Sequence, residues 1–583
     1  MGKGASVSFE DLHLENHDDK EASVLLHTLP GEEHAKLKFF DTYHDGDVVL
    51  GGVATPVQPT DAANKQYVDS LVGAKYYPSL ATAVADINNS ATDNVLTGAS
   101  AAKVKVFTAE NGRLTVMLLD DVSESGRIDI YKDIDLVLNG KTLTFTAASA
   151  YIDIATDIIC NIYGEVSGSA IVKRSNGTGK ASVRLINISA GELHMRGGRY
   201  ANEGNESAIT LRIGGTARVI ADGCEIHCSS TGAAPGYIAR GVQSTTSELI
   251  EFRNTKIISN AGYQSDGFMG MSPTNAKNCT IICDGHLVFG FLADVSTKPN
   301  TPVTLENCNI TATTLDMSPP NSADNGHATG LDLGGGIIKV SNCKVVADAY
   351  NDNAYETCST GIKVYNTCTC FINSCHVFGT HTGVANSTKG KLYVSGGVLT
   401  GYSHGGFYFA HGVDGEAFVK DAVIRCGNYE GIFTEYFAEG STSGNNPLAS
   451  FYIATPGNDA TTNGSTVYLD GCTIGYPGKT AFVLRGTDGE QNCTVNISNS
   501  TIVDGANQIR VDNETHKLNV GVGTNITADK IDHPQWAKFT GLNYRRYNED
   551  ETVDGKDCAA LSGELSRILN RLGGIINAEE VAY

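Results

Sequence analysis

Apolar and polar positions along the chain repeat in a short template, whose clearest copy is the segment VTLENCNI. Val303 and Leu305 alternate with polar residues, as the buried face of a strand does. Cys308 and Ile310 are also apolar, yet they lie an odd number of residues beyond Leu305, so one continuous strand would place them on the opposite face. A bend at Asn307 would bring all four inside, because asparagine accepts a left-handed backbone. The pattern predicts two short strands joined by a sharp corner.

The template recurs eleven times, aligned on a small residue that a branched aliphatic residue follows two positions later. The intervals between copies run from 22 to 50 residues. Fixed core positions with variable intervals indicate stacked rungs that carry loops of different length. We therefore predict an all-β fold, a right-handed parallel β-helix solenoid. The small residues are Gly191, Cys224, Thr255, Cys279, Cys308, Cys343, Cys375, Gly397, Ala422, Cys472 and Ser500.

A second strand follows the corner in many copies and often begins with glycine, as in Gly330-Leu-Asp-Leu, Gly361-Ile-Lys-Val and Gly406-Phe-Tyr-Phe. The interval of 50 residues, from Ala422 to Cys472, is either two rungs or one rung with a long excursion.

The two ends of the solenoid are expected to be helical. Leu80, Val84 and Ile87 have helical spacing behind Ser79, a suitable N-cap, and this helix would cover the open end of the first rung. Near the C-terminus an apolar stripe predicts a helix of about 16–20 residues. This stripe either forms a three-helix bundle in a trimer, which we favour, or caps the last rung. It consists of Leu561, Leu565, Ile568, Leu569, Leu572, Ile575 and Ile576.

These patterns divide the chain into five segments. They are an attachment and trimerisation segment (1–72), a capping helix with first, looser rungs (73–180), the regular β-helix (181–505), an irregular connector (506–555) and the C-terminal amphipathic helix (556–583).

The composition narrows the function classes. A formal net charge of −22 argues against a nucleic-acid partner, because phosphate binding needs a basic face. Six of the 15 cysteines occupy the same inward position of the template, which favours an interior stack of free thiols. Disulfides or a metal site are the alternative, at Cys224/Cys228, Cys279/Cys283 or the cluster Cys368, Cys370 and Cys375, but none has the spacing of a four-ligand zinc site. We expect no metal and no cofactor.

No N-terminal apolar run has the form of a signal peptide, and no stretch of 18 apolar residues is present. We therefore expect synthesis in a cytoplasm and no membrane insertion; a role outside the cell would require release by lysis or as part of a particle.

One stretch near the N-terminus resembles a known family. The sequence PTDAANKQYVDS resembles the "DAANKxYVDS" stretch of tail fibre proteins of tailed bacteriophages, and the matching residues are Asp61, Asn64, Lys65, Tyr67, Val68 and Asp69. The resemblance implies a homotrimer in the virion tail, made in the host bacterial cytoplasm and attached through this segment to other tail or baseplate proteins. An ordinary capped helix from Asp61 to Val72 is the alternative. The helix-then-strand opening of the solenoid also resembles pectin-lyase-like β-helix proteins, including phage tailspikes.

The long excursion at 427–465 is rich in aromatic residues between glycine, serine and asparagine. A lateral loop of this kind can present aromatic faces to a sugar, whereas an extra strand pair would pack the same rings against the rod. The candidate glycan-binding residues are Tyr429, Phe433, Tyr436, Phe437, Phe451 and Tyr452.

Phage spikes of this fold often cleave polysaccharides with paired carboxylates, which must lie on one side of neighbouring rungs. The register of the rungs decides which carboxylates pair, so the catalytic residues stay unknown from the sequence. The candidates are Asp266, Asp332, Asp348, Asp352, Glu356, Glu430 and Glu435, with His376, His381, His404 and His411 nearby.

Three function classes remain. The first is a virion fibre that binds a bacterial surface glycan, which we favour. The second is a depolymerising tailspike, a polysaccharide hydrolase or lyase. The third is a cellular β-helix adhesin, which should carry a secretion signal.

Overall fold

The computed structural model describes residues 73–88, 101–109, 111–175, 182–233, 235–296, 301–314, 327–349, 359–401, 405–409, 415–427, 449–454, 466–477, 479–485, 493–505, 509–511 and 516–539. The chain divides into two units, Met1–Ala74 and Lys75–Tyr583, and the solenoid belongs to the second. The predicted attachment motif (Asp61 to Asp69) and the C-terminal apolar stripe both lie outside the described residues.

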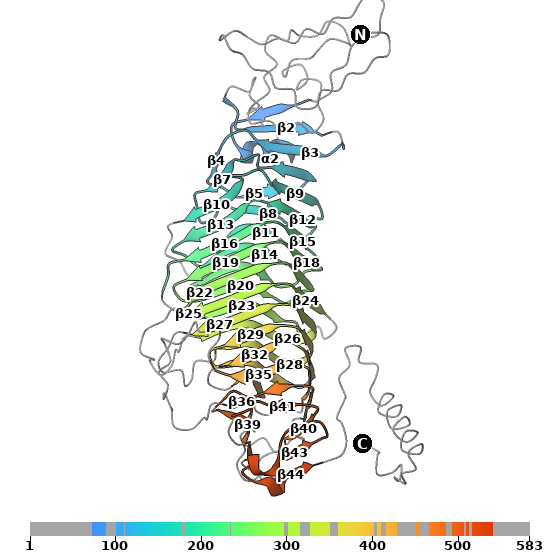
Figure 1. The fold of residues 1–583 in the computed structure, drawn as a ribbon. Helices are drawn as coiled ribbons and strands as arrows, with labels where there is room; N and C mark the ends of the chain where they lie inside the picture. Colours follow the sequence, from blue (N-terminus) through green and yellow to red (C-terminus); the bar gives the residue numbers. More distant parts are fainter. Residues whose placement is uncertain are drawn as a thin grey trace, which may run out of the picture. The chain divides into compact units, whose positions relative to one another are not determined.

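The described part of the second unit is an all-β solenoid with parallel strands, as expected for a β-helix (Figure 1). Most rungs contribute strand residues to each of three faces, and successive rungs pair in parallel. Face 1 consists of β5 (Ile128–Ile130), β8 (Ile152–Ile154), β11 (Val183–Ile188), β14 (Ala208–Ile213), β17 (Ile238–Ser244), β20 (Gln264–Gly270), β23 (Leu287–Asp294), the first halves of β26 (His327–Ser341) and β28 (Thr360–Asn373), β30 (Thr382–Thr388), β33 (Phe407–Phe409), β36 (Ala449–Ala454), β39 (Thr480–Arg485) and β42 (Arg510–Val511).

Face 2 continues each rung after a turn. It consists of β3 (Leu114–Leu118), β6 (Ile134–Val137), β9 (Ile159–Gly164), β12 (Glu192–Gly197), β15 (Arg218–Asp222), β18 (Leu249–Arg253), β21 (Thr274–Lys277), β24 (Pro302–Glu306), the second halves of β26 and β28, β31 (Lys391–Ser395), β34 (Glu416–Lys420), β37 (Thr466–Asp470), β40 (Thr494–Ser498), β43 (Lys517–Val520) and β44 (Ala537–Phe539).

Face 3 follows the sharp corner of the sequence template. It consists of β4 (Val122–Glu124), β7 (Thr142–Phe145), β10 (Ala170–Ser175), β13 (Arg199–Gly204), β16 (Glu225–Ser230), β19 (Lys256–Ala261), β22 (Thr280–Gly285), β25 (Asn309–Thr314), β27 (Lys344–Ala349), β29 (His376–Gly379), β32 (Val398–Gly401), β35 (Val423–Cys426), β38 (Thr473–Ile474) and β41 (Thr501–Ile502).

The corner between faces 2 and 3 has the predicted geometry. Val303 and Leu305 on β24 and Cys308 and Ile310 beyond the bend are all buried, and Asn307 between them has φ +54°. A residue with positive φ stands at the same position in ten of the eleven template copies. Its left-handed backbone bends the chain sharply, so that the apolar residues before and after the corner all point inward. These residues are Gly223, Asn254, Asn278, Asn307, Asn342, Ser374, Gly396, Asp421, Gly471 and Asn499.

The thirteen cysteines of the described ranges are all free and buried, as the interior-stack prediction requires. Within the stack, each thiol lies close to the backbone of the preceding rung. The Sγ atoms of Cys308, Cys343 and Cys375 donate to the carbonyl oxygens of Ala276, Leu305 and Val340 at 3.5, 3.7 and 3.5 Å. The column is therefore part of the core.

The N-terminal end begins with β1 (Lys75–Tyr77), β2 (Val104–Thr108) and β3, which pair antiparallel. The expected helix is present as α2 (Leu80–Ile87): the Ser79 side chain accepts a hydrogen bond from Thr82 N, and Leu80, Val84 and Ile87 are buried. In Figure 1, α2 lies beside the first rungs.

The stack extends past residue 505, where the irregular connector was expected to begin. β40, β43 and β44 continue face 2 in parallel, with 3-10 helices η2 (Ala528–Lys530) and η3 (Pro534–Trp536) before β44. On face 3 the side chain of Asn525 replaces a strand, since its Oδ1 accepts from Ile502 N at 2.6 Å and its Nδ2 donates to Ile502 O at 2.9 Å. The sequence missed these rungs because polar turns and side-chain caps replace the apolar template there. Within the described ranges, no helix is long and apolar enough to span a membrane.

Candidate functional site

The long excursion predicted to bind glycan is part of a single rung, because β35 pairs directly with β38. Phe451 lies in the core at 0% exposure, with its ring 5.2 Å from that of Phe407. Tyr452 is 2% exposed, and its ring stacks on that of Tyr408 at 5.6 Å. These two rings therefore offer no open face to a sugar. The other four predicted residues (Tyr429, Phe433, Tyr436 and Phe437) lie outside the described residues.

The candidate carboxylates are spread over different faces. Asp266 on face 1 is fully buried and paired with Arg240, with Nε and Oδ2 2.7 Å apart. Asp348 on face 3 accepts a hydrogen bond from Thr380 at 3.3 Å. His376 is exposed on face 3, and His381 lies edge-on to Tyr408. Asp352, Glu356, Glu430, Glu435, His404 and His411 lie outside the described residues.

Asp332 belongs to a group on face 1 that combines two carboxylates with a lysine and a tyrosine. Register places Leu292, Asp332 and Lys363 side by side on β23, β26 and β28. It likewise aligns Asp294 with Gly334 and Tyr365. We call Asp294, Asp332, Lys363 and Tyr365 the Asp332 cluster. Their neighbours in sequence, such as Ala293, Leu331 and Val364, point into the core, so all four face outward.

Asp332, Lys363 and Tyr365 lie close together. Asp332 Oδ2 lies 3.8 Å from Lys363 Nζ, and Lys363 Nζ lies 5.5 Å from the centre of the Tyr365 ring. Tyr365 lies close enough to Asp332 to lower the pKa of its carboxyl group. The Oδ1 atom of Asp294 accepts a hydrogen bond from Ser296 N at 3.1 Å.

The backbone beneath the cluster is adapted to seat Tyr365. A Cβ atom at Gly334 would stand 2.6 Å from Cζ of Tyr365, so only glycine leaves room for this ring. Gly335 and Gly336 follow with φ +72° and +71°, and the register shifts there. Residues other than glycine rarely adopt this conformation. The strand thus departs from regular geometry next to Asp332.

Electrostatics distinguish Asp332 from an ordinary surface carboxylate. The side chain is nearly buried, and burial raises its pKa, while Lys363 and Tyr365 lower it and Asp294 raises it. Burial together with the two carboxylates raises the pKa of Tyr365. The nearby His327 has its pKa lowered to about 4, first by burial and then by Lys363 and His286. A carboxyl group whose pKa is raised, beside a second carboxylate, is suited to proton transfer.

The sequence named Asp332 but missed Asp294, Lys363 and Tyr365. A usable signal was present, because aligning Gly330-Leu-Asp-Leu with Gly361-Ile-Lys-Val puts Asp332 opposite Lys363. No comparable motif marks Asp294 or Tyr365.

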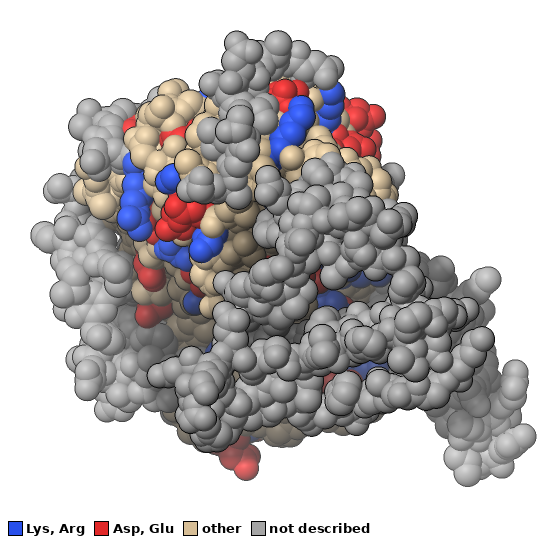
Figure 2. Space-filling model, turned by 90° about the horizontal axis from the view of Figure 1, so that it is seen from above, with Lys and Arg blue, Asp and Glu red and all other residues tan. Residues whose placement is uncertain are grey.

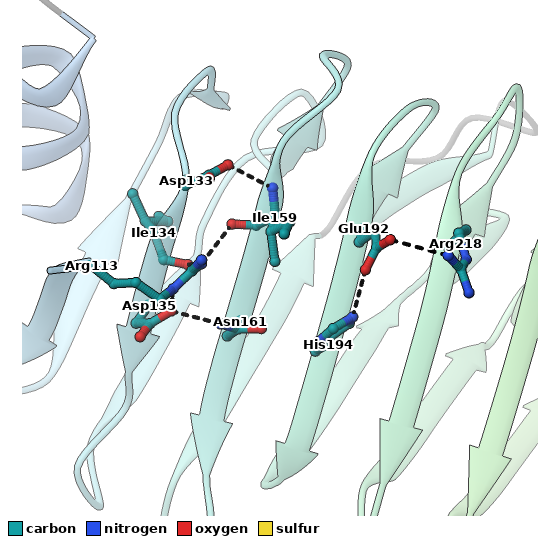
Figure 3. Close-up of polar contacts among 9 residues, drawn as sticks. All are labelled: Arg113, Asp133, Ile134, Asp135, Ile159, Asn161, Glu192, His194 and Arg218. Atoms are coloured by element: carbon teal, nitrogen blue, oxygen red, sulfur yellow. Dashed lines mark hydrogen bonds and ion pairs between the residues drawn. The ribbon is translucent and has the colours of Figure 1, made fainter. Parts of the chain in front are cut away.

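A second polar group lies on face 2 near the first rungs (Figure 3). Arg113 Nε donates to Asp135 Oδ1 at 2.7 Å, and its Nη2 donates to the carbonyl of Ile159 at 3.0 Å. Asn161 also donates to Asp135. Farther along, Glu192 contacts His194 and Arg218 at 3.1 and 3.3 Å. These side chains bond to one another or to the backbone of the strands, so we interpret them as contacts that stabilise the stacking of the rungs.

In the end-on view of Figure 2, Lys and Arg side chains lie beside Asp and Glu side chains on the described part of that face. Among the described residues, no group of three or more His, Cys, Asp or Glu side chains could hold a metal ion. Comparison with known proteins identifies no matching family model, no matching curated protein and no matching solved structure.

Proposed function

We propose that the protein is a tail fibre or tailspike-like component of a bacteriophage that attaches the particle to a glycan on the bacterial surface. The observation that carries the proposal is the segment PTDAANKQYVDS, which resembles tail fibre proteins in six motif residues. In this proposal the solenoid is a right-handed β-helix, and residues 1–72 bind other tail or baseplate proteins.

The solenoid suits this role physically. Its strands stack in register through most of the described chain, and its core runs from Tyr77 to Ile531. A rigid rod holds loops and side faces at a fixed distance from its base, and binding residues are commonly carried on such scaffolds.

The experiment is adsorption of the purified, fluorescently labelled full chain to a panel of bacterial strains. We expect saturable binding to a restricted set of strains, and unlabelled protein should compete. Uniform weak binding to every strain, or none to any, would contradict the attachment role.

Assembly as a homotrimer is part of the proposal and rests on the C-terminal apolar stripe. Leu565→Asp together with Leu572→Asp should convert a trimer into monomers or aggregates, because two charges would enter the apolar seam. Multi-angle light scattering gives the mass directly. If the variant remained a trimer, we would conclude that the stripe caps the last rung of the solenoid.

A second candidate function, cleavage of the bound polysaccharide, is favoured by the Asp332 cluster alone. The cluster lies outside the core, and burial raises the pKa of its Asp332 carboxyl group.

A further inference from the structure

We propose that the solenoid core carries an oxidation site, at which hydrogen peroxide closes two disulfides, Cys279–Cys308 and Cys343–Cys375, between neighbouring rungs. We call these four residues the four-thiol column. The inference goes beyond the attachment role and does not depend on it, because the column is built from the core alone.

The backbone places the four cysteines at bonding distance. They occupy the same template position in four consecutive rungs, because the residues that follow them are register partners from rung to rung. Neighbouring strands are about 4.8 Å apart, and disulfides join Cα atoms roughly 4.4–6.8 Å apart. A disulfide between neighbours in the column therefore needs little backbone movement. The following residues are Thr280, Asn309, Lys344 and His376.

The sulfur atoms of the column also lie close to the adjacent rung. Cys308 N donates to Sγ of Cys343 at 3.4 Å, so the thiol of one rung reaches back to the rung before it. By contrast, Cys279 and Cys283 are four residues apart along an extended chain, roughly 13 Å, which is too far for a disulfide. The rung-to-rung neighbours are therefore the better partners.

The two ends of the column decide how the thiols pair. The template position holds Thr255 in the rung before Cys279 and Gly397 in the rung after Cys375. Neither residue offers a thiol. Pairing from each end therefore uses all four cysteines, whereas a single bond between the two middle cysteines would leave both outer ones without a partner.

The pKa shifts give each pair one nucleophile and one resolving thiol. Contact with Cys279 lowers the pKa of Cys308, and contact with Cys343 lowers the pKa of Cys375. Contact with Cys308 raises the pKa of both Cys279 and Cys343. Because the thiolate is the reactive form, Cys308 and Cys375 react with the peroxide first.

The chemistry balances with hydrogen peroxide as the oxidant. The Cys308 thiolate attacks one peroxide oxygen, the O–O bond breaks, and the departing hydroxide takes up the proton that Cys308 released. The product is a sulfenic acid and one water molecule. The Cys279 sulfur then attacks the sulfenic sulfur, and the S–S bond forms as the S–O bond breaks. The hydroxyl group leaves with the Cys279 proton as a second water, so two thiols lose two electrons and one peroxide gains them.

Cys375 and Cys343 react in the same way. In this proposal the column stays reduced in the cytoplasm, where thiols are kept reduced, and oxidises once the protein is outside the cell. All four thiols are at most 2% exposed, so a small peroxide reaches them more readily than a bulky reagent does. Each disulfide then joins two adjacent rungs covalently, and the oxidised rod should resist unfolding.

The test exposes the native, fully reduced chain to hydrogen peroxide, removes the peroxide with catalase and alkylates the remaining thiols during acid denaturation. Mass spectrometry of an unreduced digest should then find two linked peptide pairs, Cys279 with Cys308 and Cys343 with Cys375. Met271 is 44% exposed, and its oxidation to the sulfoxide reports that the peroxide dose was sufficient. The midpoint of chemical unfolding should rise on oxidation and return after reduction.

Two serine variants test the role of neighbouring thiols. Serine fits the template position, because Ser500 occupies it at 0% exposure. Cys308→Ser should lose the linkage of Cys279 and keep the other pair. The matched control is Cys472→Ser: Cys472 occupies the same position between Ala422 and Ser500, so it has no thiol in either adjacent rung, and both linkages should form.

Three results would overturn the proposal. The first is four thiols that still alkylate after Met271 has become the sulfoxide. The second is oxidation of Cys308 or Cys375 to sulfinic or sulfonic acid with no linked peptide. The third is a bond from Cys375 to Cys370, which lies on the same rung, instead of to Cys343.

Discussion

Gly330 lies directly against Val345: a Cβ atom at Gly330 would stand 2.4 Å from Cγ1 of Val345 and 2.6 Å from the carbonyl oxygen of Gly361. The same relationship repeats along face 1, where a column of glycines packs against branched side chains of face 3. The register that aligns Leu331 with Ile362 makes Gly330 and Gly361 neighbours in this column. The glycines are Gly241, Gly267, Gly290, Gly330 and Gly361. The column lets faces 1 and 3 approach closely.

Gly330→Ala should therefore destabilise the rod by about 1–3 kcal/mol, because an added methyl group overpacks the core. Thermal unfolding followed by circular dichroism measures the change. The matched control is Gly126→Ala, since a Cβ there meets nothing within 4 Å. Equal melting temperatures for the two variants would contradict the close packing of faces 1 and 3.

The sequence predicted the repeating unit because every rung repeats the same local pattern of inward residues and a bend. Val303, Leu305, Cys308 and Ile310 mark the inside, and Asn307 marks the corner. The sequence also showed the glycine at the start of the next strand, Gly330. Only the structure shows why glycine is needed there, because it shows the contact with Val345. The site was harder to predict, since Asp294 and Asp332 are 38 positions apart in the sequence and only the rung register makes them neighbours.

The corner residue Asn307 provides a second test. Its φ of +54° costs most side chains roughly 1–2 kcal/mol, so Asn307→Ala should destabilise the rod by about that amount. Asn307→Gly removes the same amide contact to Asn278 but accepts the backbone conformation, so it should be nearly neutral. Chemical denaturation of the two variants separates the effects. If the glycine variant were as unstable as the alanine variant, the loss of stability would come from the side-chain hydrogen bond between Asn307 and Asn278 and not from the backbone conformation.

The thiol column predicts slow chemical labelling. The thirteen described cysteines are buried, so a thiol reagent should modify them only as the rod unfolds. Absorbance with an aromatic disulfide reagent should show at most two fast thiols, Cys358 and Cys558, which lie outside the described residues. Fast reaction of six or more thiols in the native protein would contradict the burial of the cysteine column.

Lys173 predicts a pH dependence of stability. Its Nζ atom is buried and donates to the carbonyl oxygens of Ala148, Ala150 and Arg184 at 2.6, 2.7 and 2.8 Å. Burial lowers its pKa from 10.5 to about 8. Between these values the unfolded chain binds more protons than the folded one, so this residue's contribution to stability rises with pH from about 8 to about 10.5.

The measurement is the difference in unfolding free energy between the unaltered protein and Lys173→Met across that pH range. The variant should be less stable by about 1–3 kcal/mol at pH 8, because buried carbonyl groups lose their donor. The gap should then widen towards pH 10.5. A gap that narrows with rising pH would mean that the folded lysine keeps an ordinary or raised pKa.

Selective treatment of the target cells tests the central claim, attachment through a surface glycan, most directly. A strain that binds the full chain is treated either with mild periodate, which oxidises the vicinal diols of sugars, or with a broad-specificity protease. Adsorption is then measured by flow cytometry with the labelled protein. We predict that periodate abolishes adsorption and that protease leaves it unchanged. Adsorption that survives periodate and disappears after protease would contradict the account.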